Sequence, residues 1–154
     1  MHLLADRPDL VAAAGELRWR EWGHPPEPVE LSFWVDITGS EAGRDGLPAT
    51  WVACAANGEV VGAVGIGEFD LDAIRDRSPW VMGMIVHPDW RRAGIGRRLL
   101  DRLDPHARRL GHDRIWVATG TTAAVDFYRA CGYEPAGHAL DDYGQDAHIL
   151  VKSV

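Results

Sequence analysis

The chain has few cysteines, a single lysine and no long apolar run. Its 154 residues include only two cysteines, Cys54 and Cys131, which lie far apart and have no metal-ligand spacing. Free cysteines usually fill core space, so we interpret both as structural residues. No HExxH or CxxC pattern accompanies the seven histidines. The sequence therefore predicts no metal site.

The shortage of apolar runs also bears on location. No stretch approaches the roughly 18 consecutive apolar residues of a membrane-spanning helix. The first residues reach acidic side chains before any apolar run of signal-peptide length, so we expect a cytoplasmic protein without a membrane segment.

Positive charge comes almost wholly from arginine, since Lys152 is the only lysine, and the net charge is −7. An acidic surface disfavours binding to the phosphate backbone of nucleic acids, and it is compatible with a cationic substrate.

What the chain does contain is a regular succession of apolar segments separated by proline and glycine. The periodicities predict one mixed α/β domain over residues 1–154, in the order β-α-α-β-β-β-α-β-α-β-β. The expected elements are an edge strand (1–5), two helices (5–22 and 28–39), a hairpin (49–69), a strand (80–86), a helix (94–110), a strand (114–119), a helix (121–133) and a closing strand pair (133–140 and 146–154).

Three local signals refine this order. Asn57-Gly58 predicts a type I′ turn in the hairpin, because that turn needs two residues that tolerate positive φ. Residues 80–86, WVMGMIV, are apolar without alternation, which is typical of a central strand covered on both faces. Pro105 lies inside the helical pattern that begins at Gly94 and predicts a kink near residues 103–104.

The join between strand 80–86 and the helix after it reads HPDWRRAGIGRRLL, residues 87–100. Glycine inside a helix start costs about 0.8–1.0 kcal/mol relative to alanine, so its presence here needs a reason. Helix N-termini carry unpaired N–H donors, glycines let an anion approach the main chain, and arginines add forked donors. The combination predicts a phosphate-binding turn. A P-loop is excluded because residues 87–100 contain no lysine, and a dinucleotide fingerprint is excluded because Leu99 stands at its last glycine.

Two segments resemble one family. VMGMIVHPDWRRAGIGRRLL (residues 81–100) and AAVDFYRACGY (residues 123–133) are similar to the two motifs of the GNAT superfamily of acetyl-CoA-dependent N-acetyltransferases. The resemblance covers roughly the C-terminal half of the chain. It implies a single GNAT-like domain, with a central, mostly antiparallel twisted sheet flanked by about four helices.

The resemblance also implies a co-substrate site for acetyl-CoA. Main-chain donors of the turn would take the CoA pyrophosphate, the end of the central strand would pair with the pantetheine arm, and the thioester would point into a gap beside strand 114–119. Tyr128 would face the CoA sulfur, and Thr121 stands where family members often carry asparagine. The implied cofactor-binding residues are Met84, Ile85, Val86, Arg91, Arg92, Ala93, Gly94, Ile95, Gly96, Arg97, Thr121 and Tyr128.

The catalytic pair expected on this basis is Tyr128 and Glu68. Some family members use a glutamate on the central strand, where this chain has Trp80 or its apolar neighbours. Glu68 is the first candidate for the base because it follows a strand that borders the expected cleft, and Asp70 and His87 are the alternatives. For the acceptor site the resemblance favours the first two helices and the loop before the last strand, with Trp22, Phe33, Asp70 and Asp142 as the expected substrate-binding residues.

The sequence thus predicts an N-acetyltransferase that moves an acetyl group from acetyl-CoA to a primary amine on a small cationic molecule, by direct attack in a ternary complex. A protein N-terminal or lysine acetyltransferase and a non-catalytic acyl-CoA sensor remain the alternatives. The identity of the amine, the length of the acyl group and the choice between monomer and homodimer stay open.

Overall fold

The computed structural model describes residues 1–154, which form two compact units. The first unit contains residues 1–66 and 83–102, and the second contains residues 67–82 and 103–154. Strand β4 (Trp80–Val86) contributes its first residues to the second unit and its last residues to the first.

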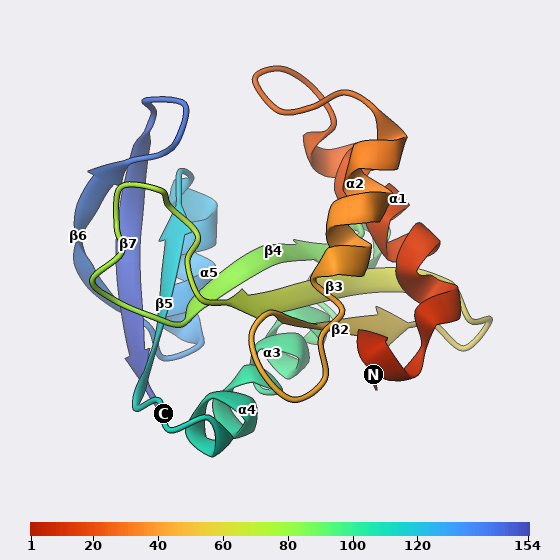
Figure 1. Ribbon diagram of the computed structural model, residues 1–154. Coiled ribbons are helices and arrows are strands. Elements are labelled where there is room, and N and C mark those ends of the chain that lie inside the picture. Colours follow the sequence, from red (N-terminus) through yellow and green to blue (C-terminus); the bar gives the residue numbers. More distant parts are fainter. The chain divides into compact units, whose positions relative to one another are not determined.

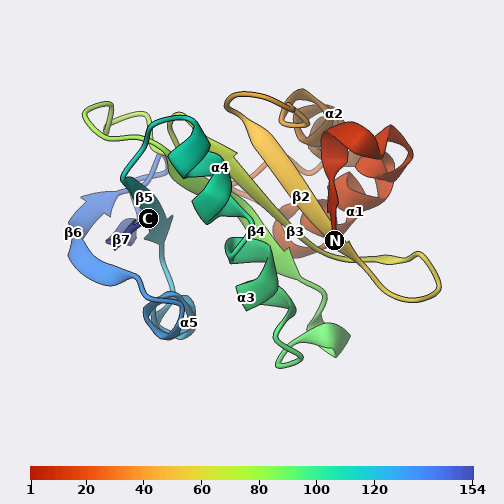
Figure 2. The ribbon, with the colours of Figure 1, turned by 90° about the horizontal axis from the view of Figure 1, so that it is seen from below.

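The first unit is built on antiparallel strands covered by helices on both faces. Strands β1 (His2–Leu3), β2 (Ala49–Cys54) and β3 (Val60–Gly67) are hydrogen-bonded in that order, with Leu3 opposite Trp51 and Val52 opposite Ala63. Helices α1 (Val11–Trp22) and α2 (Leu31–Ser40) lie on one side of these strands, and α3 (Ile95–Leu100) lies on the other (Figures 1 and 2). Every residue of β3 is buried, as its apolar composition requires.

The main core of this unit joins α1 to the strands. Leu10, Ala14 and Leu17 place one stripe of α1 against the strands, where they pack with Val52 and Ala63. On the opposite face of the sheet, the absence of a side chain at Gly62 lets α3 come close. A Cβ there would lie 3.0 Å from a methyl group of Leu99 and 3.2 Å from one of Ile95. Burial of these apolar side chains fixes the helix that follows the turn at residues 87–94.

The second unit combines one parallel and two antiparallel strand pairs. Strand β4 pairs in parallel with β5 (Arg114–Thr119) at Trp80 and Trp116, and β5 pairs antiparallel with β7 (Asp146–Ser153). The edge strand β6 (Glu134–Leu140) pairs antiparallel with β7, which gives the order β4-β5-β7-β6. Helices α4 (Leu103–Arg109) and α5 (Thr122–Ala130) complete the unit. The prediction of a mixed α/β chain with mostly antiparallel strands is confirmed.

Several element boundaries differ from those predicted. The first helix begins at Val11, because the stretch before it forms two short 3-10 helices, η1 (Leu4–Asp6) and η2 (Pro8–Leu10), separated by Arg7. The second helix begins at Leu31, three residues later than expected. None of the helices has the length and apolar character that a membrane span requires.

The predicted helix 94–110 is instead two helices. α3 ends at Leu100 and α4 begins at Leu103, so that Pro105 occupies the first turn of a new helix. Proline has no N–H to donate to the carbonyl four residues earlier, and a first turn is where that loss is tolerated. The break replaces the kink that the sequence predicted, and it gives five α-helices where about four were expected.

The predicted type I′ turn of the β2–β3 hairpin is also wrong, although the hairpin is present. Gly58 has a left-handed φ of +87°, whereas Asn57 does not. The Gly58 N–H donates to the Ala55 carbonyl at 2.9 Å, and the Asn57 side-chain oxygen accepts from the Glu59 N–H at 3.0 Å. The connection thus belongs to the longer class, in which one left-handed glycine follows an ordinary turn.

Candidate functional site

The turn between β4 and α3 contains two left-handed residues. It follows the short 3-10 helix η3 (Pro88–Trp90) and runs from Arg91, which is extended with φ −65° and ψ 157°, to Arg92, with φ +65°. Gly94, the residue before α3, is again left-handed, with φ +74°. An extended residue followed by a left-handed one reverses the chain as in a tight turn, and the N–H groups of such turns can form a concave anion-binding nest.

Open space surrounds this nest. A Cβ built on Gly94 would meet no atom within 4 Å, and residues 91–94 are all exposed. The first turn of α3 adds N–H donors that have no partner inside the helix. These features fit the diphosphate that the sequence predicts here. The left-handed Arg92 was not foreseen, because non-glycine residues seldom adopt positive φ and nothing in the residue type marks it.

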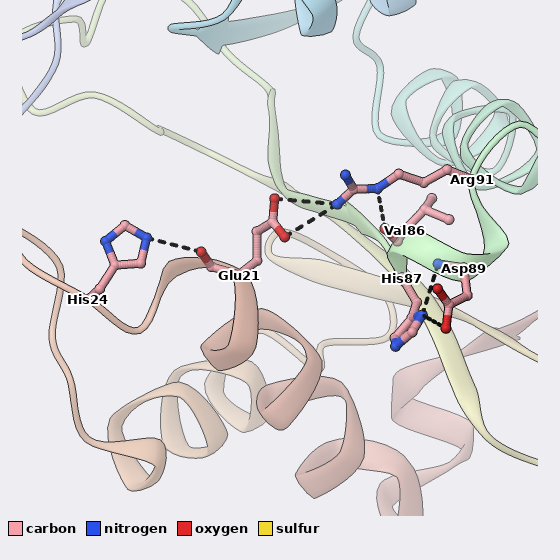
Figure 3. A network of polar contacts seen from close by, with 6 residues as sticks. All are labelled: Glu21, His24, Val86, His87, Asp89 and Arg91. Carbon is pink, nitrogen blue, oxygen red and sulfur yellow. Dashed lines mark hydrogen bonds and ion pairs between the residues drawn. The ribbon is translucent and has the colours of Figure 1, made fainter.

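The side chain of Arg91 is engaged within the first unit (Figure 3). Its Nε donates to the carbonyl of Val86 at 3.0 Å, and its Nη2 lies 3.4 and 3.3 Å from the two carboxylate oxygens of Glu21 at the end of α1. The sequence predicted that Arg91 and the main chain of Val86 would both face the cofactor. In this structure each is the other's partner, and Glu21 offsets part of the arginine charge.

His87 stabilises the start of the same turn (Figure 3). Its Nδ1 accepts a hydrogen bond from the Asp89 N–H at 3.3 Å, so the ring caps η3. An imidazole nitrogen that accepts from a main-chain N–H carries a lone pair that is already used. This contact favours a capping role for His87 over the role of a base.

The three β4 residues predicted to meet the pantetheine arm, Met84, Ile85 and Val86, follow a kink in the strand. Gly83 has a left-handed φ of +52°, which is unusual inside a strand. Such a residue interrupts the regular ladder and changes the direction of the N–H groups around it. Met84 and Val86 are half-buried, whereas Ile85 is buried in the core.

Tyr128 is buried in the second unit. It lies in α5 with 6% of its surface exposed, and its ring packs edge-on against Phe127 and Tyr133 at centroid distances of 5.3 and 5.4 Å. Burial raises the pKa of Tyr128 well above its ordinary value, and the negative charges of Asp70 and Cys131 add to the effect. The phenol therefore stays protonated at neutral pH and can act as a hydrogen-bond donor.

The predicted carboxylates of the second unit differ in their surroundings. Glu68 follows β3 and is exposed, whereas Asp70 is half-buried and its charge acts on Tyr128. Asp142 is exposed, and its Oδ1 accepts from the Asp72 N–H at 3.0 Å, which links the β6–β7 loop to the segment before β4. Thr121 caps α5, with its hydroxyl accepting from the Ala124 N–H at 3.2 Å.

In the first unit, the two aromatic residues predicted to bind substrate lie around a third. Trp34 of α2 is buried and donates from its indole to the Pro28 carbonyl at 2.9 Å. Trp22 packs against it at a centroid distance of 6.0 Å, and Phe33 at 5.7 Å. Phe33 is 40% exposed, so this cluster presents one aromatic face to solvent. Trp22 and Phe33 thus share Trp34 as a neighbour, and Trp22 also packs against the core of the unit.

Two polar residues of the first unit were missed by the sequence analysis, Glu21 and Arg18. Both lie on α1, one turn apart, in a segment that was assessed for its apolar stripe. Their partners lie up to 70 positions away in the chain, so no local signal marked either residue. No group of three or more histidine, cysteine, aspartate or glutamate side chains is arranged to hold a metal ion.

Comparison with known proteins identifies the relatives of this architecture. The family model described as "Acetyltransferase (GNAT) family" matches residues 11–133. Aminoglycoside N(6')-acetyltransferase type 1 from Stenotrophomonas maltophilia is 33% identical over 135 residues, which cover 82% of each chain.

Solved structures agree on the fold. A spermidine N-acetyltransferase chimera from Vibrio cholerae aligns with a TM-score of 0.73 and 21% identity, over 99% of this chain and 94% of that one. An aminoglycoside 6'-N-acetyltransferase in complex with coenzyme A aligns with a TM-score of 0.72 and 16% identity, over 96% of this chain and 92% of that one. At these identities the structures establish the fold alone.

Proposed function

This chain belongs to the GNAT acetyltransferase family, and from that premise we propose that it transfers an acetyl group from acetyl-CoA to a primary amine of a small cationic molecule. The amine attacks the thioester directly, in a ternary complex that forms within one domain over residues 1–154. The observation that carries the proposal is the turn from Arg91 to Gly94, whose backbone and open space suit a diphosphate.

The turn would hold the CoA diphosphate through main-chain N–H groups of residues 92–97. Arg92 and Arg97 add charge to the main-chain donors. Arg91 would have to leave Glu21 before it could bind a phosphate, and the Val86 carbonyl becomes available to the pantetheine arm when Arg91 moves.

Acetyl transfer makes three demands on the chain. The attacking nitrogen must be neutral, and freeing an amine of pKa 10.4 at pH 7 costs about 4.6 kcal/mol. The thioester oxygen must be polarised, which main-chain N–H groups of β4 would do. The departing thiolate must be stabilised, and we assign this to the protonated hydroxyl of Tyr128.

The amine proton would leave through a carboxylate of the segment after β3. Glu68 is the candidate base because it is exposed and can exchange protons with solvent. Asp70 is the alternative, and its charge already acts on Tyr128. The variants Glu68→Gln and Asp70→Asn distinguish the two candidate bases. Substitution of the residue that acts as the base should lower kcat and remove the acidic limb of the pH–rate profile, and substitution of the other carboxylate should leave that limb in place.

A small cationic acceptor is supported by two independent observations. The chain carries a net charge of −7, which attracts cations over long range. Proteins with similar sequence or fold are named for aminoglycosides and spermidine, both of which carry several amino groups. A cytoplasmic location remains a prediction of this proposal, whereas the choice between monomer and homodimer stays open.

A CoA-release assay over an amine panel tests the proposal. The panel contains spermidine, an aminoglycoside, free amino acids, a lysine-containing peptide and a peptide with a free N-terminus, each with saturating acetyl-CoA. We expect turnover with the small polyamines and none with the peptides. Turnover with peptides alone would favour the protein acetyltransferase, and binding of acetyl-CoA without any turnover would favour a sensor.

A further inference from the structure

Arg18 is a buried arginine that uses only one of its terminal nitrogens. It lies in α1 with 2% of its surface exposed, and its Nη1 donates to Thr38 Oγ1 at 3.2 Å and to Glu41 Oε2 at 2.6 Å. These bonds connect α1 to α2 and to the residue that follows α2. An α1–α2 link of this kind needs no more than the Nη1 group.

The opposite edge of the same guanidinium is unpaired. Both Nε and Nη2 are buried, and neither has a hydrogen-bond partner. Together they form the side-on fork of donors with which arginine usually holds two oxygens. Burial of charged donors without a partner is costly, so their retention at this position needs a reason beyond the α1–α2 link.

The unpaired edge faces the kink of β4. A Cβ on Gly83 would lie 2.7 Å from both Cζ and Nη2 of Arg18, and 2.8 Å from Nε. The guanidinium therefore fills the space that any side chain at this position would need. Glycine is required twice over, once by this contact and once by its left-handed φ of +52°.

We propose that Arg18 is a positioning residue of the acetyl-transfer site, which holds the Gly83 kink of β4 in place and supplies positive charge beneath the main chain that meets the thioester oxygen. The inference rests on the proposed function. Gly83 directly precedes Met84, the first of the β4 residues expected to contact the pantetheine arm.

The charge acts on the step in which the oxygen becomes negative. The amine nitrogen forms a bond to the carbonyl carbon, and the π electrons move to the oxygen. The carbonyl then reforms as the C–S bond breaks, the amine proton passes to the base and from it to solvent, and the thiolate, hydrogen-bonded by Tyr128, takes up a proton from solvent. The Arg18 cation is buried in a medium of low dielectric, so it would stabilise the negative oxygen that forms in these steps without touching that oxygen.

The test compares two variants that break the same ion pair from opposite ends. Arg18→Met removes the charge and keeps a long side chain, whereas Glu41→Gln removes the partner and keeps the charge. Turnover, acetyl-CoA affinity by calorimetry, and melting temperature are measured for each, with the best amine of the panel. We expect both variants to lower the melting temperature, and only Arg18→Met to lower kcat, by about tenfold or more. The acetyl-CoA Kd should change less than kcat, because most of the expected cofactor contacts lie at the turn at residues 91–97 and only the pantetheine arm meets the main chain after the kink.

Arg18→Lys provides the conservative rescue, because lysine keeps the charge without the fork. Its kcat should lie between those of the wild type and Arg18→Met. Equal losses of kcat in Arg18→Met and Glu41→Gln would overturn the inference and leave only an α1–α2 link. If Arg18→Met does not fold, Arg18→Lys carries the test alone, and a kcat equal to that of the wild type overturns the inference.

Amide hydrogen exchange separates this inference from the proposed function. Exchange at residues 83–85 should be faster in Arg18→Lys than in the wild type, because the kink loses its support. This readout needs no amine, so a wild type that binds acetyl-CoA but turns over nothing would refute the proposed function alone. Unchanged exchange at these residues would refute the positioning role even in an active enzyme.

Discussion

The contact between Glu21 and Arg91 predicts that a single substitution on α1 tightens coenzyme A binding. Glu21→Gln removes the carboxylate charge that lies 3.3 Å from the guanidinium and keeps the shape of the side chain. Arg91 is then left with its bond to the Val86 carbonyl and is no longer held by an opposite charge. The substitution also removes a negative charge that repels the phosphates of the cofactor.

The magnitude follows from the geometry and the exposure. Two unit charges at 3.3 Å attract by about 1.3 kcal/mol in bulk water. The Arg91 and Glu21 side chains are 49% and 39% exposed, and pairs of this kind contribute about 0.2–1 kcal/mol. A gain of about 0.5–1 kcal/mol corresponds to a Kd for coenzyme A that is about 2- to 5-fold lower.

Calorimetry at two salt concentrations provides the assay. At low ionic strength the full effect should appear, and it should shrink at about 0.3 M salt, where the Debye length is shorter than 10 Å. Glu16→Gln is the matched control, because it removes the same charge from the same helix and breaks the exposed pair with Arg20. Its Kd should stay close to that of the wild type.

Weaker binding in Glu21→Gln would refute this reasoning. It would mean that Glu21 orients Arg91 for the cofactor, so that the ion pair prepares the site and does not compete with the ligand. An equal gain in Glu16→Gln would show that only the net charge of the chain matters.

The remaining predictions concern the glycine of the turn and the buried tyrosines. Gly94→Val should abolish measurable coenzyme A binding in calorimetry, because the new side chain enters the open space beside the nest. The control is Gly58→Val, which changes an equally left-handed glycine in the β2–β3 turn and should leave coenzyme A binding normal. A similar loss of binding in both variants would contradict the explanation. Tyr128→Phe should lower turnover by about tenfold or more with little change in cofactor affinity, and unchanged turnover would remove Tyr128 from the mechanism. Burial raises the pKa of both Tyr128 and Tyr133. Above about pH 10 the unfolded chain therefore releases phenol protons that the folded chain keeps. As a result, the free energy of unfolding falls as pH rises. Urea denaturation at pH 9 and 11 measures this fall in the free energy of unfolding. Tyr133→Phe should reduce the fall, whereas Tyr143→Phe, at an exposed tyrosine, should not. Equal effects of the two substitutions would contradict the assignment of the pH dependence to the buried tyrosines.

Local physics made much of the fold predictable from the sequence. The features that made this possible depend on residues adjacent in the chain. They are the unbroken apolar run of β4, the glycine and proline breaks, and the two motifs of the C-terminal half. The errors also arose locally, where the same residue types suit more than one backbone conformation. Pro105 divided a helix that was expected to kink, and Asn57-Gly58 adopted a longer turn than expected. Pro105 is accommodated by the first turn of a new helix, and Asn57-Gly58 by a turn with one left-handed glycine.

The candidate site divides in the same way. The place of the turn at residues 91–96 could be predicted from its glycines and from the helix that follows it, except for the left-handed φ of Arg92. The surroundings of its side chains could not. Glu21 reaches Arg91 across 70 positions of the sequence, and Asp70 acts on Tyr128 from a different element of the second unit.

The sequence by itself determined that a strand leads into a glycine-bearing turn with free amide donors, because φ preferences and helix ends depend on a few consecutive residues. Only the tertiary structure decided which charges at that turn are already paired and which buried donors elsewhere in the first unit have no hydrogen-bond partner. Arg18 shows the difference most clearly, since its position on α1 gives no sign that it lies against Gly83. Electrostatic interaction depends on distance through space and on exclusion of water, and folding sets both.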